Sequence, residues 1–127
     1  MIRVGVVGAA GRMGRTVCEA VAAAEDMEVL ARVDVGDPLE VVDDCDVVVD
    51  FTAPDVVMDT LRHCIPAGVH VVVGTSGFDT ARLAQVEQLL ADHPHVGVLV
   101  APNFSIGAVL MMRFAAVAAP YFESVEV

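Results

Sequence analysis

The sequence predicts an α/β fold in which a parallel sheet carries helices on both of its faces. Three observations predict it. Short β-branched runs alternate along the chain with helical segments. One run, residues 47–49, is apolar without interruption, as in a strand covered on both sides. Glycine-containing loops follow three of the strands. This order is typical of a doubly wound, Rossmann-type sheet with right-handed crossovers.

The elements are expected in a regular order. Strands are expected at about residues 2–7, 28–33, 47–49, 70–73 and 96–100, and helices at about 12–24, 54–64, 80–91 and 106–121. Pro54 suits the first turn of the second helix, and residues 66–68 should end it. The last helix is strongly apolar, which predicts that it is buried. A turn of helix could begin at Pro38, and residues 123–127 alternate like the start of a strand.

The first strand runs into a glycine-punctuated turn, GAAGRMG, that opens the first helix. Gly8, Gly11 and Gly14 depart from the usual G-x-G-x-x-G dinucleotide fingerprint. A helix start presents unpaired N–H groups and the positive end of the helix dipole, so an anion such as a pyrophosphate is expected there. Asp34 follows about twenty residues later, where the fingerprint places an acid that binds ribose. The context predicts a dinucleotide site; the alternative is a tight turn without a ligand.

Composition and charge narrow the possible partners. The 127 residues fit one domain. The net charge of −11, from 18 acidic and 7 basic residues, argues against nucleic acid and anionic membranes. No apolar run reaches the roughly 18 residues of a membrane span, and the N-terminus shows no secretory pattern. We therefore expect a soluble, cytoplasmic protein.

The cysteines and histidines show no metal-ligand spacing. The three cysteines are widely spaced without a C-x-x-C motif, so we expect them to be reduced and packed: Cys18, Cys45 and Cys64. The four histidines have no zinc-type spacing with them: His63, His70, His93 and His95. No metal site is expected.

Four motifs occur together in a fixed order. They are GAAGRMG at residues 8–14, DFT at 50–52, GTSGF at 74–78 and APNFSIGAVL at 101–110. With these motifs, the whole chain resembles the N-terminal half of the 4-hydroxy-tetrahydrodipicolinate reductase (dihydrodipicolinate reductase) family. The four together make another Rossmann oxidoreductase, of the homoserine or aspartate dehydrogenase type, the weaker alternative. The resemblance implies reduction of 4-hydroxy-tetrahydrodipicolinate to tetrahydrodipicolinate by NADH or NADPH, in the diaminopimelate route to lysine.

The resemblance also implies which residues hold the nicotinamide dinucleotide. The pyrophosphate would lie on Gly8, Ala9, Ala10, Gly11, Arg12 and Met13, and the adenosine ribose on Asp34. The nicotinamide end would be lined by Gly74, Thr75, Ser76, Ala101, Pro102, Asn103 and Phe104, and Phe51 and Thr52 would also bind the cofactor. Ser76 stands where many members have a second threonine that contacts a substrate carboxylate, and serine keeps the hydroxyl. For Asn103 the alternative is a side chain that only stabilises its loop.

One departure from the family concerns the chemistry. The family's histidine pair, its lysine and its D-A-P-S-G-T-A run have no match here, and the chain contains no lysine. The family is held to use those groups to protonate the developing carbanion and to grip the dicarboxylate substrate, so no catalytic residue is expected in this chain.

The domain interpretation follows from that departure. Residues 1–127 are interpreted as the dinucleotide-binding domain, with residues 122–127 leading toward an absent substrate and oligomerisation domain, through which the family resemblance implies a homotetramer. Such a chain should bind the cofactor without turnover. The alternative from another class is a stand-alone dinucleotide-sensing module.

Asp34 also bears on the choice of cofactor. A carboxylate accepts a hydrogen bond from a ribose 2′-hydroxyl but repels a 2′-phosphate, and the next residue is Val35 rather than an arginine. NADH should therefore bind at least as well as NADPH. Arg12 or Arg32 could still offer a cation to the phosphate.

Overall fold

The computed structural model describes residues 1–124 of the chain. In chain order the elements are β1 (Ile2–Val7), α1 (Arg12–Ala23), β2 (Met27–Val33), η1 (Leu39–Val42), β3 (Val47–Asp50), α2 (Val57–Ala67), β4 (His70–Val73), α3 (Thr80–Ala91), β5 (Val98–Val100), α4 (Ile106–Ala118) and η2 (Ala119–Tyr121). The segments η1 and η2 are short 3-10 helices. The strand expected to start within residues 123–127 lies mostly outside the described residues.

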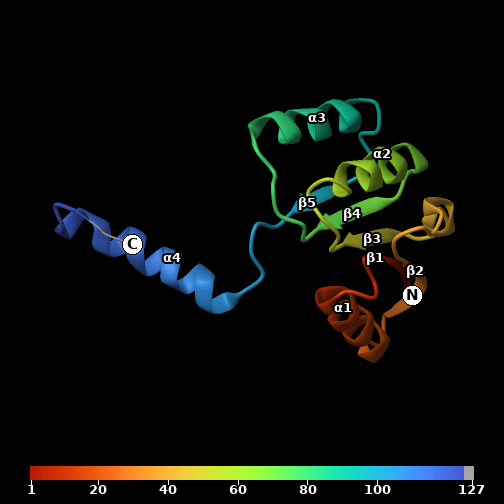
Figure 1. Cartoon of the computed structure of the whole chain (residues 1–127), viewed down its shortest axis with the longest axis horizontal. Helices are drawn as coiled ribbons and strands as arrows, with labels where there is room; N and C mark the ends of the chain where they lie inside the picture. Colours follow the sequence, from red (N-terminus) through yellow and green to blue (C-terminus); the bar gives the residue numbers. More distant parts are fainter. Residues whose placement is uncertain (125–127) are drawn as a thin grey trace.

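The five strands form one parallel sheet in the order β2-β1-β3-β4-β5. β1 lies between β2 and β3, and its Val7 lies opposite Val33 of β2 and Asp50 of β3. Figure 1 shows α1 on one face of the sheet and α2 and α3 on the other. The chain builds outward from β1 to β2 and then crosses to the other side of β1 to form β3. The predicted Rossmann-type, doubly wound sheet is therefore confirmed.

Alternate residues along the strands supply two separate cores. On one face, Val48 and Val73 belong to a buried cluster that includes Leu61 of α2. On the other face, Val6 belongs to a cluster that includes Val21 of α1. Complete burial of an aliphatic side chain contributes about 1.5–3 kcal/mol. The helices are therefore held on the sheet mainly by apolar burial.

The three cysteines are free and buried, as expected. Cys18 is on α1 and belongs to the core between that helix and the sheet. Cys64 is on α2 and, with Cys45, belongs to the core on the other face. Burial raises the pKa of the Cys64 thiol to about 12. In the described part of the chain, no group of histidine, cysteine, aspartate and glutamate side chains is arranged to hold a metal ion.

The bounds of α2 differ from the prediction at both ends. The helix begins at Val57 rather than Pro54, and it continues through Pro66 to Ala67, beyond the expected end at about residue 64 but within the expected stop at residues 66–68. Gly68 ends the helix with φ 83°, and the N–H groups of Gly68 and Val69 donate to Ile65 and Cys64. This is the Schellman arrangement, which needs a glycine after the last turn. Pro66 is tolerated because its fixed φ suits a helix and it removes only one hydrogen bond.

The last helix, α4, is the largest departure from the prediction. It was expected to be buried to Tyr121, but it ends at Ala118 and no side chain on it is buried. Ile106 and Phe114 are 78% and 67% exposed, and Figure 1 shows α4 extending away from the sheet. Apolar composition predicts that a helix needs a cover but not which element supplies it. No element within residues 1–124 covers α4.

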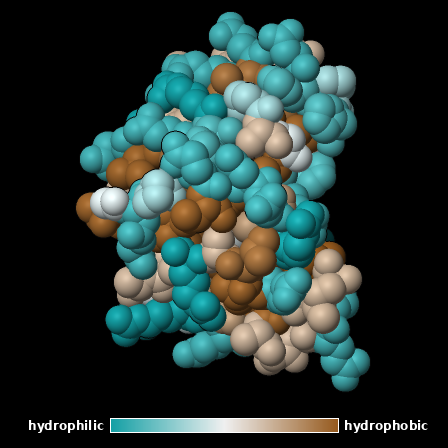
Figure 2. All heavy atoms as spheres, turned by 90° about the vertical axis from the view of Figure 1, so that its right-hand side faces the viewer, coloured by the Kyte–Doolittle hydropathy of each residue, from teal (hydrophilic) through white to brown (hydrophobic). Residues whose placement is uncertain are grey.

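The surface at the other end of the molecule has a different character. Figure 2 views the side opposite α4 and shows a mainly hydrophilic surface broken by hydrophobic patches.

None of the described helices is both long enough and apolar enough to cross a membrane.

Side-chain caps start the helices where the sequence supplies them. Asp79 accepts a hydrogen bond from the N–H of Arg82 and begins α3 at Thr80, as predicted. Ser105 caps α4 in the same way. β5 begins at Val98, two residues later than expected, and the N–H of Gly97 donates to His70 Nδ1 instead.

Replacing Gly14 with alanine should destabilise the fold by about 3 kcal/mol or more. A Cβ at Gly14 would lie 2.0 Å from the backbone oxygen of Gly8, which cannot rotate away. The control is Gly97→Ala, whose Cβ would meet only His70 Nδ1 at 3.5 Å. Urea denaturation measures both free energies of unfolding. A Gly14→Ala variant as stable as the control would contradict the close contact.

Acid should weaken the link between the starts of β1 and β3. The guanidinium and the backbone N–H of Arg3 donate to Asp46 at 2.7 and 2.8 Å and lower the pKa of its carboxyl to about 2. Since the folded-state pKa lies below the ordinary value of 3.8, this stabilisation is complete at neutral pH and is lost as the pH falls from about 4 to about 2.

The variant Asp46→Asn should therefore melt at a lower temperature at pH 7 and show a flatter pH dependence in that window. Thermal melts across the pH range measure this. Asp44→Asn, an exposed neighbour without a hydrogen-bonded partner in the described residues, is the control. A parent-like pH profile for Asp46→Asn would refute the prediction.

Candidate functional site

The carboxyl ends of the five parallel strands meet at one edge of the sheet, where open α/β folds bind their ligands. The loops after β1, β3, β4 and β5 come together there. One cavity at this edge is lined by Met13, in the first turn of α1, and by residues of the loops after β3, β4 and β5, among them Phe51, Gly74 and Phe104. The loops after β3, β4 and β5 therefore meet beside the start of α1.

The turn after β1 is packed backbone against backbone. Gly8 has φ 83°, and a Cβ there would lie 2.4 Å from the carbonyl oxygen of Phe51. Its N–H donates to Val33 at the end of β2. Gly14 lies in turn against the carbonyl of Gly8. Both glycines are therefore required by close approach, whereas Gly11 has an ordinary extended backbone, with φ −68° and ψ 170°.

The N-terminus of α1 is open to an anion. Gly11 caps the helix without a side-chain acceptor, and the first turn carries no acidic residue. The first N–H groups of the helix therefore lack an anionic partner within the helix, and the helix dipole adds positive potential in front of them. Arg12 and Met13 begin the helix. This geometry suits the pyrophosphate expected from the sequence.

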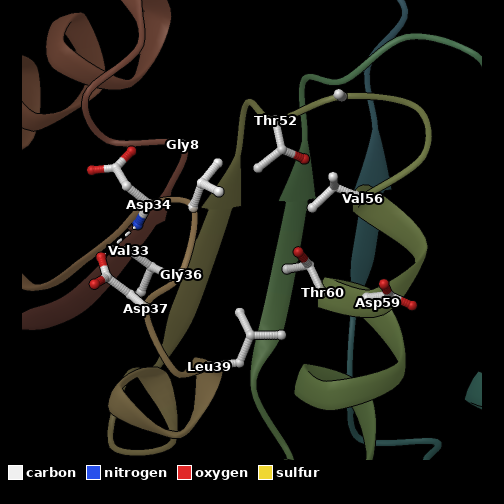
Figure 3. A pocket seen from close by; sticks show the side chains of 12 residues that line it. Gly8, Val33, Asp34, Gly36, Asp37, Leu39, Thr52, Val56, Asp59 and Thr60 are labelled. Atoms are coloured by element: carbon white, nitrogen blue, oxygen red, sulfur yellow. Dashed lines mark hydrogen bonds between the residues drawn. The ribbon is translucent and has the colours of Figure 1, made fainter.

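A cavity of about 500 Å³ lies beside the end of β2. Figure 3 shows Asp34 and Asp37 on one side of it and Asp59 and Thr60 of α2 on the other. Asp34 Oδ1 accepts a hydrogen bond from the N–H of Ala10 at 2.9 Å, and Asp37 accepts one from the N–H of Asp34 at 2.9 Å. Asp34 therefore links the end of β2 to the glycine turn, and the cavity is distinctly acidic.

Asp50, at the end of β3, joins two loops of the site. Its Oδ1 accepts hydrogen bonds from the hydroxyls of Thr52 and Thr75, both at 2.7 Å, and from the N–H of Thr52 at 3.0 Å. Asp50 and Thr75 are buried. The hydroxyl protons of both threonines are therefore used within the protein, so only other groups of these residues remain for a ligand.

Aromatic contacts shape the other half of the edge. The rings of Phe51 and Phe104 lie 5.5 Å apart between centroids. A Cβ at Gly74 would lie 2.1 Å from the Phe51 ring, so the loop after β4 sits directly on that ring. Ser76 is exposed and lines a cavity together with Met13 and other residues of this region.

The site residues expected from the sequence fall into two groups along this edge. Gly8, Asp34 and Thr52 line the cavity beside β2. Thr52 also lines the cavity on the other side, which it shares with Met13, Phe51, Gly74, Thr75 and Ser76; a neighbouring cavity adds Pro102, Asn103 and Phe104. Thr52 therefore stands at the junction of the two halves.

Five expected residues lie at this edge without lining a described cavity, and one of them is Gly11, the cap of α1. Ala9 is buried and donates to Val33, Ala10 donates to Asp34, and Ala101 donates to Val73. Arg12 is exposed at the start of α1.

Asn103 has the loop-stabilising contact that was the alternative to a binding role. Its Oδ1 accepts a hydrogen bond from the N–H of Ser105 at 2.8 Å. That bond does not use the amide NH2 group of Asn103, which lies in an exposed loop beside the cavity. The binding role of Asn103 stays a prediction.

Sequence reasoning missed three acidic residues. The DFT motif places Asp50 at the ligand-binding edge of the sheet, but the sequence assigns no role to its side chain. Asp37 and Asp59 line the cavity beside β2 but carry no motif. Their contribution depends on how η1 and α2 pack, which no local pattern specifies.

Comparisons with known proteins agree with this geometry. Residues 2–104 match the family model described as dihydrodipicolinate reductase, N-terminus. The chain is 62% identical over 127 residues to the 4-hydroxy-tetrahydrodipicolinate reductase of Thermobifida fusca and 59% identical over 128 residues to that of Nocardia farcinica. These alignments cover 100% and 99% of this chain but 52% of each relative. The chain therefore spans about half the length of the curated relatives it matches.

Solved structures give the same result. Dipicolinate-bound dihydrodipicolinate reductase from Paenisporosarcina sp. TG-14 matches with a TM-score of 0.79 at 34% identity, over 96% of this chain and 55% of that one. Apo scyllo-inositol dehydrogenase from Lactobacillus casei matches with a TM-score of 0.67 at 16% identity, over 94% of this chain and 42% of that one, which shows the shared fold alone. By its sequence match over residues 2–104 and its fold, the chain belongs to the dihydrodipicolinate reductase family.

Proposed function

We propose that residues 1–127 form the cofactor-binding domain of a 4-hydroxy-tetrahydrodipicolinate reductase. The row of cavities along the carboxyl edge carries this proposal: one lies beside Asp34, the other beside Ser76, and Thr52 lines both. An extended dinucleotide fits such a row, with its two ends on either side of the open N-terminus of α1. The named reductases to which the chain is similar support the assignment.

The cofactor would be NADH or NADPH, and the chain's residues suit it. N–H groups at the start of α1 would hold the pyrophosphate, Asp34 would accept a hydrogen bond from the adenosine ribose, and the nicotinamide would lie near Ser76 and Phe104. A Cβ at Gly11 would meet only the Gly8 oxygen, at 3.2 Å, so the space in front of the cap is open. The bound nicotinamide supplies the hydride.

The substrate would be a small cyclic dicarboxylate, as in lysine and diaminopimelate biosynthesis. The solved relative holds dipicolinate, a dicarboxylate. In this chain the Ser76 hydroxyl would donate to a substrate carboxylate beside the nicotinamide end, and its place in the lining of that cavity supports this role. The proposal places the protein in the cytoplasm and, through parts of the protein beyond the described residues, in a homotetramer.

The proton that accompanies the hydride would come from outside the described residues. His70 lies at the start of β4, where its Nδ1 accepts from the N–H of Gly97, and His63 pairs with Asp43 at 2.7 Å. His93 and His95 precede β5. His70, His93 and His95 therefore lie toward the amino edge of the sheet, and no histidine lines a described cavity at the carboxyl edge.

That placement favours one alternative, a domain that senses dinucleotides without chemistry. The two proposals differ in their response to a dicarboxylate. A reductase domain should bind dipicolinate more tightly when NADH is present, because Ser76 and the nicotinamide share a cavity. A sensor should be indifferent to it. Calorimetric titration of dipicolinate with and without NADH separates them.

NADH should bind at least as well as NADPH. Asp34, Asp37 and Asp59 line the cavity expected to hold the adenosine ribose, and their charges oppose a 2′-phosphate. Removing one charge, in Asp59→Asn, should strengthen NADPH binding more than NADH binding. Asp55→Asn, an exposed acid that does not line the cavity, is the control. Fluorescence titration measures both affinities; NADPH binding more than about tenfold tighter, or about 1.4 kcal/mol, would refute the prediction.

Replacing Gly11 with valine should abolish cofactor binding in a folded protein. The backbone at Gly11 is extended and accepts a side chain, but the isopropyl group would occupy the space in front of the helix N-terminus. Gly97→Val, at the opposite edge of the sheet, is the matched control and should bind NADH normally. Calorimetry measures affinity and circular dichroism checks folding. Parent-like affinity in folded Gly11→Val would mean that the pyrophosphate lies elsewhere.

A further inference from the structure

We infer that Asp50 is a positioning residue for the nicotinamide end of the site. It lines none of the described cavities at this edge, but it bonds Thr52 and Thr75, which do. Through these two residues its carboxylate fixes the loops that follow β3 and β4. The inference rests on the proposed function, because it assigns the nicotinamide end to the cavity beside Ser76.

The side chain of Asp50 is a hydrogen-bond acceptor shared by Thr52 and Thr75. Asp50 has no exposed surface, and its Oδ1 receives two hydroxyl protons and one N–H. Hydrogen bonds within such a buried network strengthen one another. Without this acceptor, the hydroxyl of the buried Thr75 would lose its partner at a desolvation cost, and the hydroxyl of the half-buried Thr52 would lose its partner as well. The loops would move to find new partners.

The direction of these bonds determines what each hydroxyl can do. A threonine hydroxyl has one proton, and that of Thr75 goes to Asp50. Its oxygen then accepts the N–H of Thr52 at 2.9 Å. Thr75 is thereby held on both sides, and the exposed Ser76 follows it directly. Asp50 therefore sets the position of the one hydroxyl in this loop that remains for a ligand.

The end of β3 contacts the loops on both sides of the cavity beside Ser76. The N–H of Gly74 donates to the backbone oxygen of Asp50 at 2.9 Å, which adds a second link to the loop after β4. The next residue, Phe51, has its ring against Gly74 and Phe104. A shift of the Asp50 carboxylate would therefore change the positions of groups on which the nicotinamide should rest.

A purely structural role predicts a different result from a positioning role. If the network only stabilises the fold, loosening it lowers the melting temperature and weakens all ligands equally. If Asp50 positions the nicotinamide end, the loss is confined to ligands that carry a nicotinamide. ADP-ribose makes the comparison possible, because it keeps the adenosine, the pyrophosphate and the second ribose but lacks the nicotinamide.

The test compares the dissociation constants of NADH and ADP-ribose by calorimetry on the full chain. Asp50→Asn keeps one oxygen acceptor but puts an NH2 donor in place of the second oxygen, which is buried without a partner, so NADH should bind at least about fivefold more weakly while ADP-ribose changes by less than about twofold. The matched control is Asp34→Asn, the same chemical change at the adenosine end. It should weaken both ligands by the same factor.

Thr75→Val gives an independent route, since it removes the hydroxyl with little change of shape. It should shift the ratio of the two constants in the same direction, and Thr75→Ser should restore it. If Asp50→Asn does not fold, the comparison of Thr75→Val with Thr75→Ser tests the positioning role instead. A parent-like ratio in the folded variants would overturn the positioning role alone. Failure of the parent chain to bind either ligand would overturn the proposed function, and this inference with it.

Discussion

Contact between backbones at the first turn is the constraint on which the rest of the site depends. Gly8 lies against the carbonyl of Phe51, and Gly14 lies against the carbonyl of Gly8. No side chain could fit at either contact, so β1, α1 and the end of β3 approach as closely as backbones can. This closeness places Gly8 beside one cavity and Met13 beside the other, with the N-terminus of α1 between them.

Much of this arrangement could be predicted from the sequence, because it depends on local patterns. Uninterrupted valine runs identify strands covered on both sides, and the position of Asp34 follows from its distance to the glycine turn. The partner of Asp50 could not be predicted in this way. Thr75 lies 25 residues away, and only the pairing of β3 with β4 brings it within 2.7 Å.

The misjudged helices show the same limit. The end of α2 depends on Gly68 and Val69 together, so within the expected stop at residues 66–68 it is Gly68 and not Pro66 that ends the helix. The apolar sequence of α4 correctly indicates a helix, whereas its exposure depends on whether an element is present to cover it. Both errors concern packing and hydrogen-bond partners, not secondary-structure propensity.

The buried thiols of Cys18 and Cys64 report separately on the two faces of the sheet. Cys18 is on the buried side of α1 and Cys64 is on the buried side of α2, and the two helices cover opposite faces of the sheet. Only a thiolate reacts readily with an alkylating reagent, and burial together with a raised pKa suppresses that reaction at Cys64. Labelling must then wait until a helix lifts from the sheet. The alkylation rates of the two cysteines therefore measure how often each face opens, without any added probe.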